Sequence, residues 1–189
     1  SEVTKWGTIW NTIEKKKYSI SHNDLYPSMS ILDGNLTLSL SLKNSVITIF
    51  DALSHSFESI WNKNKCEKAT NNAIKAICLI LKNVDDIEKK LFDLSFRNTI
   101  LEASNLAGLA MSQTKTAAAH SISYPLTAFF DIPHGIACSM PIIPLLKING
   151  PKIEKEINII IKKLKLKSLS KQAGLSSEDF DQCLNDQEL

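Results

Sequence analysis

The chain has 189 residues, of which 43% are hydrophobic and 22% charged, and its net charge is +2. This length can bury a core of ordinary size and suits one domain plus part of another. The balanced charge argues against a nucleic-acid-binding face, because the one basic run, over residues 162–167, is typical of a solvated helix face. No apolar stretch approaches the roughly 18 residues that a membrane-spanning helix needs, and no leader-like segment opens the chain. Composition therefore predicts neither nucleic acid nor membrane as a partner.

The cysteines indicate where the protein is located, and the first residue indicates whether the chain is complete. The cysteines form no C-x-x-C pair, and most stand in apolar or helical surroundings; they are Cys66, Cys78, Cys138 and Cys183. This pattern is typical of buried, reduced thiols and favours a cytoplasmic location. The chain begins with Ser1 and its opening residues read as the middle of a sequence, so we interpret it as a fragment.

The first 43 residues favour strands and turns. Residues 3–10 are rich in β-branched and aromatic side chains, residues 17–21 alternate, and Asp33-Gly34 is a turn signal. We interpret residues 1–43 as a β-rich remnant that precedes a helical domain.

From Asn44 the spacing of apolar residues changes to three and four, which is typical of helices. A break is expected at Val84-Asp-Asp, and Pro141 and Pro144 should kink or split a later helix. The predicted helices cover 45–61, 67–81, 86–112, 135–148, 153–164 and 177–184. The expected fold class is therefore mainly α, with residues 44–189 forming an all-α domain.

Asp51 and His55 form the first candidate pair of metal ligands. Residues four apart on a helix lie one turn apart on the same face, so both side chains can point at one ion. Imidazole and carboxylate together suit zinc, iron and related ions. The alternative is structural: Asp51 would interact with the dipole near a helix start, and His55 would belong to a core-facing stripe.

His120 and His134 form the second candidate pair. Pro125 predicts that the helix containing His120 ends near Ser123, after which the chain runs extended. Pro133 and Gly135 flank His134 and place it at a tight turn into the next helix. Such a return can bring the two imidazoles together, whereas a continuous helix would separate them by roughly 21 Å. His22 has no partner at ligand spacing and is interpreted as a surface turn residue.

These motifs resemble those of the iron-dependent (group III) alcohol dehydrogenases, which share the dehydroquinate-synthase-like fold. The family pattern Asp-Ala-Leu-x-His-x-x-Glu appears here over Asp51–Glu58, and its His-(thirteen residues)-His-Gly segment appears over His120–Gly135. Residues 102–108 and 1–4 also resemble family segments. The resemblance implies that Asp51, His55, His120 and His134 bind Fe²⁺ or Zn²⁺. It also implies NAD(H) or NADP(H), held mainly by a preceding α/β domain of which residues 1–43 would be the C-terminal remnant. A homodimer is a candidate assembly.

The resemblance also suggests roles around the metal. It places Thr4 and Lys17 near the cofactor, although both could equally be ordinary surface residues. Tyr124 stands where many members carry a further histidine, and could donate a hydrogen bond or relay a proton; otherwise it is a packed wall. Lys115 could contact an anionic substrate group, or be a plain exposed lysine. Residues around both positions look more like the subgroup that reduces phosphonoacetaldehyde.

The implied reaction is hydride transfer between the nicotinamide and an alcohol or aldehyde, with the ion acting as a Lewis acid on the substrate oxygen. The chain alone is expected to bind a divalent ion without turning over, since the cofactor cleft needs the preceding domain. One alternative is a metal-dependent lyase of the dehydroquinate-synthase type, although that group has a glutamate where Asp51 stands. Another is a helical metal-binding module without catalysis.

Overall fold

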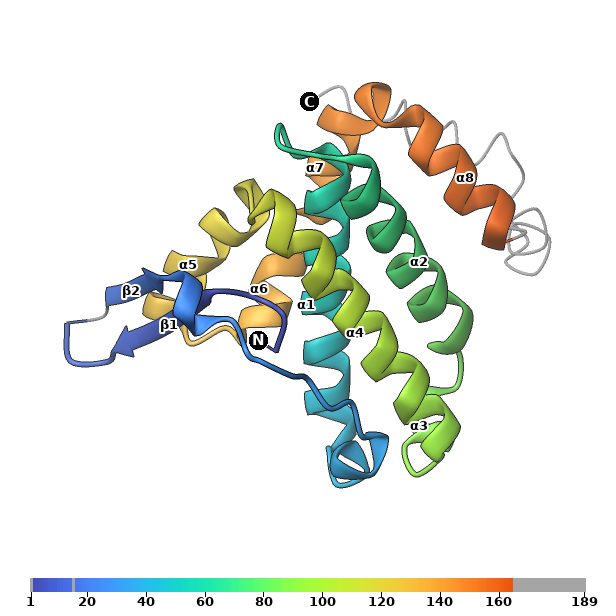
Figure 1. Ribbon diagram of the computed structural model, residues 1–189, viewed down its shortest axis with the longest axis horizontal. Helices are drawn as coiled ribbons and strands as arrows, with labels where there is room; N and C mark the ends of the chain where they lie inside the picture. The colour runs from blue at the N-terminus through green and yellow to red at the C-terminus, as the bar shows by residue number, and fades with distance from the viewer. Residues whose placement is uncertain (1, 15, 165–189) are drawn as a thin grey trace.

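The computed structural model describes residues 2–14 and 16–164, and the expected helix over 177–184 lies outside them. Within this part of the chain, a small hairpin and two short 3-10 helices precede a set of helices, as Figure 1 shows. The mainly α fold class is confirmed. No helix among the described residues combines the length and the apolar character that crossing a membrane requires.

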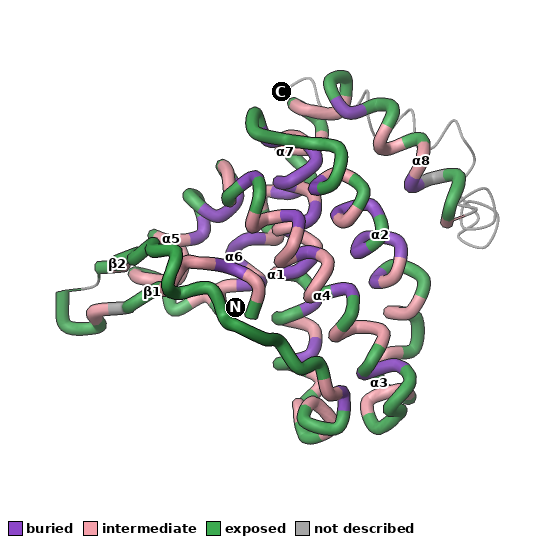
Figure 2. Tube along the Cα trace, in the orientation of Figure 1, coloured by how far each residue is buried: buried purple, intermediate pink, exposed green. Residues whose placement is uncertain are grey.

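The hairpin forms from the β-branched and aromatic residues near the N-terminus. Strands β1 (Trp6–Asn11) and β2 (Lys16–Ser21) pair antiparallel, with Trp6 opposite Ser21. The chain then crosses to the bundle through η1 (Asn23–Leu25) and η2 (Gly34–Thr37). In Figure 1 the hairpin lies beside the bundle, near α5, and Figure 2 shows that it is mostly exposed.

Three long helices form the centre of the bundle. They are α1 (Leu42–Trp61), α2 (Glu67–Asn83) and α4 (Leu94–Thr114), and each packs on the other two. Small side chains at their contacts, such as Ala76, Ala103 and Ala107, are buried together with Ile49 and Ile80. Alanine at these positions lets the helices approach closely. The residues buried between the helices are purple in Figure 2.

The predicted third helix is divided into two. The short α3 (Ile87–Lys90) ends before Asp93, whose side chain accepts hydrogen bonds from Ser95 N (2.8 Å) and Phe96 N (3.4 Å) at the start of α4. An aspartate that caps the next helix competes with continuation of the previous one. The prediction of a single helix over 86–112 was therefore wrong at this point.

The predicted end of a helix near Ser123 was also wrong. Helix α5 (Ala118–Phe130) continues through Pro125. The proline and Ser121, whose carbonyl loses its donor, are both exposed residues. The opposite face packs on α6 and α1, and this burial offsets the lost hydrogen bond.

The chain reverses after α5 and not within it. Asp131 adopts a left-handed conformation (φ 54°), and Ile132 N donates back to Leu126 O at 3.3 Å. Helix α6 (His134–Ser139) then returns along α5, and the expected break near Pro141 is confirmed because α7 (Ile142–Asn149) begins after it. A 3-10 turn, η3 (Gly150–Lys152), leads to α8 (Glu154–Leu164), which packs on α2.

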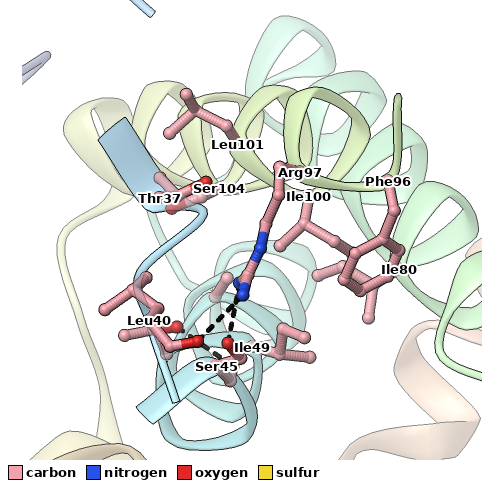
Figure 3. A pocket seen from close by; sticks show the side chains of 12 residues that line it. Thr37, Leu40, Ser45, Ile49, Ile80, Phe96, Arg97, Ile100, Leu101 and Ser104 are labelled. Carbon is pink, nitrogen blue, oxygen red and sulfur yellow. Dashed lines mark hydrogen bonds between the residues drawn. The ribbon is translucent and has the colours of Figure 1, made fainter. Parts of the chain in front are cut away.

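A buried arginine ties the segment before α1 to α4. Arg97 donates to Leu91 O (2.7 Å), Ser45 Oγ (2.7 Å) and Leu40 O (2.9 Å). It lies beside an otherwise largely apolar cavity of about 200 Å³ between α1 and α4, shown in Figure 3. The guanidinium of Arg97 thus donates to three neutral oxygens. These bonds fix where α1 begins, and with it the positions of Asp51 and His55.

Candidate metal centre

Helix α1 presents Asp51 and His55 one turn apart, as their spacing predicts. Asp51 lies in the middle of the helix, so the alternative of a residue near the helix start is wrong. His55 Nε2 is 3.5 Å from Asp51 Oδ1, and both side chains are only partly exposed. The ring of His55 stacks on that of His120 with centroids 4.3 Å apart.

His120 is held by Glu58, one further turn along α1. The glutamate is fully buried, and its carboxylate accepts from His120 Nδ1 (2.6 Å), Ala117 N (2.9 Å) and Ala119 N (2.6 Å). It therefore satisfies the first N–H groups of α5 as well as the imidazole. With Nδ1 bonded to Glu58, the other ring nitrogen of His120 points to Asp51 Oδ1 at 3.5 Å.

His134 reaches the same carboxylate because α6 lies directly against α1. A Cβ at Gly135 would stand 2.0 Å from Ile47 O and 3.2 Å from Asp51 Cβ, so only glycine permits this approach. His134 Nε2 is 3.9 Å from Asp51 Oδ1. The His-Gly dipeptide thus supplies both a donor atom and the close packing that positions it.

The chemistry of this donor set fits a divalent ion. Three imidazoles surround one carboxylate oxygen, and Asp51 Oδ1, His55 Nδ1 and His120 Nε2 are buried without a hydrogen-bond partner. Unpaired buried polar atoms are costly, and a shared cation would satisfy Asp51 Oδ1 and His120 Nε2 together. The same residue types are usual zinc and iron ligands.

The charges at this centre are strongly coupled in the metal-free protein. Burial disfavours the charged form of Asp51, but the nearby imidazoles of His120 and His55 outweigh it and hold its pKa far below the ordinary value. Burial also opposes the charge of His120, yet its close contacts with Asp51, Cys138 and Glu58 raise its pKa to about 11. A proton on His120 therefore occupies the place that a cation would take.

A cleft of about 530 Å³ opens beside the three histidines. The hairpin side contributes Thr4 and Lys17, and the helical side contributes Lys115 and Tyr124. The Tyr124 ring stacks on His134 with centroids 6.4 Å apart, and Lys17 Nζ lies 3.5 Å from the centre of the tyrosine ring. The structure therefore brings every residue proposed for cofactor, substrate or catalysis to one cleft.

Lys115 has a strained backbone at the edge of this cleft. Its φ of 64° and ψ of 176° lie in a region that residues other than glycine rarely adopt. Hydrogen bonds hold it there: Lys115 N donates to Met111 O (2.8 Å), and its carbonyl accepts from Thr114 Oγ1 (3.0 Å) and Asn62 Nδ2 (3.3 Å). Strain of this kind often accompanies a functional side chain.

Lys115→Gly is therefore expected to be more stable than Lys115→Ala by about 1 kcal/mol. Both variants lose the side chain, but only glycine adopts the backbone conformation without strain. Urea denaturation of the two variants measures the difference. Equal midpoints, or a more stable alanine variant, would show that the backbone at this position is not strained.

Two residues at the centre were missed by sequence reasoning. Glu58 belongs to the Asp51–Glu58 motif but received no role from it. Its spacing of seven residues from Asp51, two helical turns on the same face, could have indicated that it lies at the centre. Cys138 was treated only as a buried thiol, although it stands four residues after His134, the same spacing as Asp51 and His55. His22 lies exposed at the start of η1 beside Asp24, as its lack of a ligand-spaced partner predicts.

Comparison with known proteins shows which family the chain resembles. The family model for the Fe-containing alcohol dehydrogenase family, C-terminal, matches residues 45–185. A phosphonoacetaldehyde reductase of Streptomyces viridochromogenes is 27% identical over 149 residues, which are 79% of this chain and 38% of that protein. A 1,3-propanediol dehydrogenase of Citrobacter freundii is 33% identical over 137 residues, covering 72% of this chain and 35% of that protein.

Solved structures show the same fold. A sulfoacetaldehyde reductase from Bifidobacterium kashiwanohense, in complex with NAD⁺, aligns with a TM-score of 0.75 and 27% identity over 96% of this chain and 53% of that one. A 1,3-propanediol oxidoreductase aligns with a TM-score of 0.80 and 27% identity, covering 86% of this chain and 43% of that one. The chain thus spans about half or less of the length of these relatives. With the family model matching well over half of its residues, the chain belongs to the Fe-containing alcohol dehydrogenase family.

Proposed function

We propose that this chain is the metal-binding part of a cytoplasmic NAD(P)-dependent alcohol dehydrogenase that reduces a small aldehyde carrying an anionic group, such as phosphonoacetaldehyde. The observation that carries the proposal is one cleft lined by three imidazoles and by two lysines, Lys17 and Lys115. The imidazoles suit a divalent ion at the aldehyde end of the substrate. Lys115 suits a phosphonate, or a similar anion, at its other end, and Lys17 suits the cofactor.

The residues of the centre have separable tasks in this proposal. Asp51, His55, His120 and His134 would hold Fe²⁺ or Zn²⁺, which supplies Lewis-acid polarisation of the carbonyl. Glu58 fixes the ring orientation and tautomer of His120. Asp51 contributes the negative charge that makes the site selective for a cation.

The cleft side chains would position the two reactants. Thr4 lies just before β1 and Lys17 lies in β2. We assign this hairpin region, with the rest of residues 1–43, to the cofactor-binding part, and Lys17 would offer its ammonium group to the nicotinamide dinucleotide. Reduction moves a hydride from NAD(P)H to the carbonyl carbon and a proton to the oxygen. Tyr124, stacked on His134, is the proposed hydrogen-bond donor to that oxygen.

Support for the anionic substrate comes from the cleft and from the relatives. Lys115 lines the cleft and has a strained backbone, a feature that clusters at functional sites. One relative is a phosphonoacetaldehyde reductase, and one structural neighbour is a sulfoacetaldehyde reductase. Both of these named substrates combine an aldehyde with a strongly acidic group.

Lys115→Ala is expected to lower kcat/KM for phosphonoacetaldehyde by about ten- to hundredfold, the cost of one charge-assisted hydrogen bond. With propanal, which has no anionic group, kcat/KM should change little. The assay follows NAD(P)H oxidation by the purified, metal-loaded full-length enzyme of which this chain is proposed to be a part. Lys152→Ala is the control because Lys152 is exposed and does not line the cleft. An equal loss with both aldehydes would contradict the anionic substrate, and no turnover of any aldehyde would contradict the dehydrogenase itself.

A further inference from the structure

A cysteine thiol lies against the metal centre on its buried side. Cys138 is completely buried in α6, one turn after His134. Its Sγ is 3.6 Å from His134 Nε2 and 3.7 Å from His134 Nδ1. Donor atoms of Asp51, His120, His134 and Cys138 all lie within 4.8 Å of one another.

The thiol offers a second way to complete the site. Asp51, His120 and His134 are common to both possible sets of four ligands. His55 would complete one set from the cleft, and Cys138 would complete the other from the protein interior. Nitrogen and sulfur ligands of a tetrahedral Zn²⁺, at about 2.1 and 2.3 Å from the ion, lie about 3.6 Å apart. The observed separation of Sγ from His134 Nε2 has this value.

Independent evidence for a cation at this point comes from the other side chains. His120 is 2% exposed, and its Nε2 is aimed at Asp51 Oδ1 while neither atom has a hydrogen-bond partner. A neutral thiol beside these atoms would leave both unsatisfied. A cation bound jointly by the carboxylate, the imidazoles and a thiolate would satisfy all of them.

We propose that Cys138 is a thiolate ligand of the metal centre, binding from the buried side and leaving the His55 corner exchangeable at the cleft. On binding, the thiol loses its proton to solvent and the metal–sulfur bond forms without any change of oxidation state. Sulfur is a soft donor, so Cys138 would favour Zn²⁺ and Co²⁺ over the harder ions. This inference rests on the proposed metal centre, and goes beyond it by adding a sulfur donor to a set of nitrogen and oxygen ligands.

Titration of the purified, metal-free protein with Co²⁺ tests the proposal, since a thiolate bound to Co²⁺ gives a strong sulfur-to-metal charge-transfer absorption in the near ultraviolet. We expect this band to saturate at about one equivalent of Co²⁺. Cys138→Ser should abolish it and weaken Co²⁺ binding by about tenfold or more. Cys78→Ser is the matched control, because Cys78 is also buried in a helix but belongs to the core beside α8. Circular dichroism verifies that both variants fold.

Three outcomes would overturn the proposal, and they separate it from the metal centre itself. Co²⁺ bound with visible ligand-field bands but without the charge-transfer band would leave the centre in place and exclude Cys138 as a ligand. A band that persists in Cys138→Ser, or in Cys138→Ala should the serine variant misfold, would assign the sulfur to another cysteine. Failure of the wild-type protein to bind Co²⁺ at all would reject the centre and the thiolate together.

Discussion

Replacing Glu58 with alanine is expected to lower the free energy of unfolding of the metal-free protein by about 3–5 kcal/mol. Its buried carboxylate accepts from His120 and from two backbone N–H groups at the start of α5. Without it, a buried charged imidazole, a buried backbone donor (Ala119 N) and a half-buried one (Ala117 N) lose their acceptor. Urea denaturation followed by circular dichroism measures the change, and metal affinity should fall by about ten- to hundredfold as His120 loses its orientation.

Glu156→Ala is the control for this substitution. Glu156 also pairs with a cation, Lys65 Nζ at 3.1 Å, but the lysine side chain is 39% exposed. Such partly solvated pairs contribute about 1 kcal/mol or less. If Glu58→Ala lowered the free energy of unfolding no more than Glu156→Ala does, Glu58 would not stabilise the contact between α1 and α5 as proposed.

The Glu58–His120 pair also predicts a pH dependence in the metal-free protein. Hydrogen bonds from His120 and the backbone lower the pKa of Glu58 against the effect of burial, so its contribution is complete above the ordinary value of 4.5 and is lost at lower pH. The pKa of His120 is raised, so its contribution is complete below 6.5 and declines as the pH rises toward about 11. The stability difference between wild type and Glu58→Ala should be greatest between pH 4.5 and 6.5.

Asp51→Asn is expected to weaken divalent-metal binding by at least about a hundredfold, more than loss of a supporting residue. The amide keeps the shape of the carboxylate but removes the negative charge that all three imidazoles approach. Competition with a chromophoric chelator for Zn²⁺ measures the dissociation constant. Asp24→Asn, which also removes an aspartate beside a histidine but at an exposed site, should bind as tightly as wild type. An unchanged constant in Asp51→Asn would remove Asp51 from the ligand set.

The parts of the centre that sequence could predict are those set by short-range spacing. Asp51 and His55 share a helix face because four residues make one turn, and this holds whatever surrounds the helix. The meeting of His120 and His134 was expected, but for the wrong local reason. The local preference of Pro125 was outweighed by packing of the opposite face of α5, and the reversal depends on Asp131.

Other features depend on contacts between segments far apart in the chain. Glu58 can act as an acceptor only because the fold brings Ala117 N, at the start of α5, to its carboxylate. The requirement for glycine at position 135 comes from the carbonyl of Ile47 in another helix. The strain at Lys115 depends on Asn62 and Thr114. None of these partners can be identified from the spacing of residues in one segment.

Membership of the alcohol dehydrogenase family removes the support for a lyase of the dehydroquinate-synthase type. A metal-binding module without catalysis is tested by the aldehyde assays. A homodimer, a bound Fe²⁺ or Zn²⁺, and a cofactor that is NADH or NADPH stay predictions from the resemblance.

Elemental analysis of the purified protein tests the metal centre most directly. Wild type should carry about one divalent ion per chain after reconstitution and removal of excess metal. His134→Ala should retain far less, because one of the donors around Asp51 is lost, whereas His22→Ala should match wild type because His22 lies exposed at η1. Metal content in His134→Ala equal to that of wild type would contradict the ligand set.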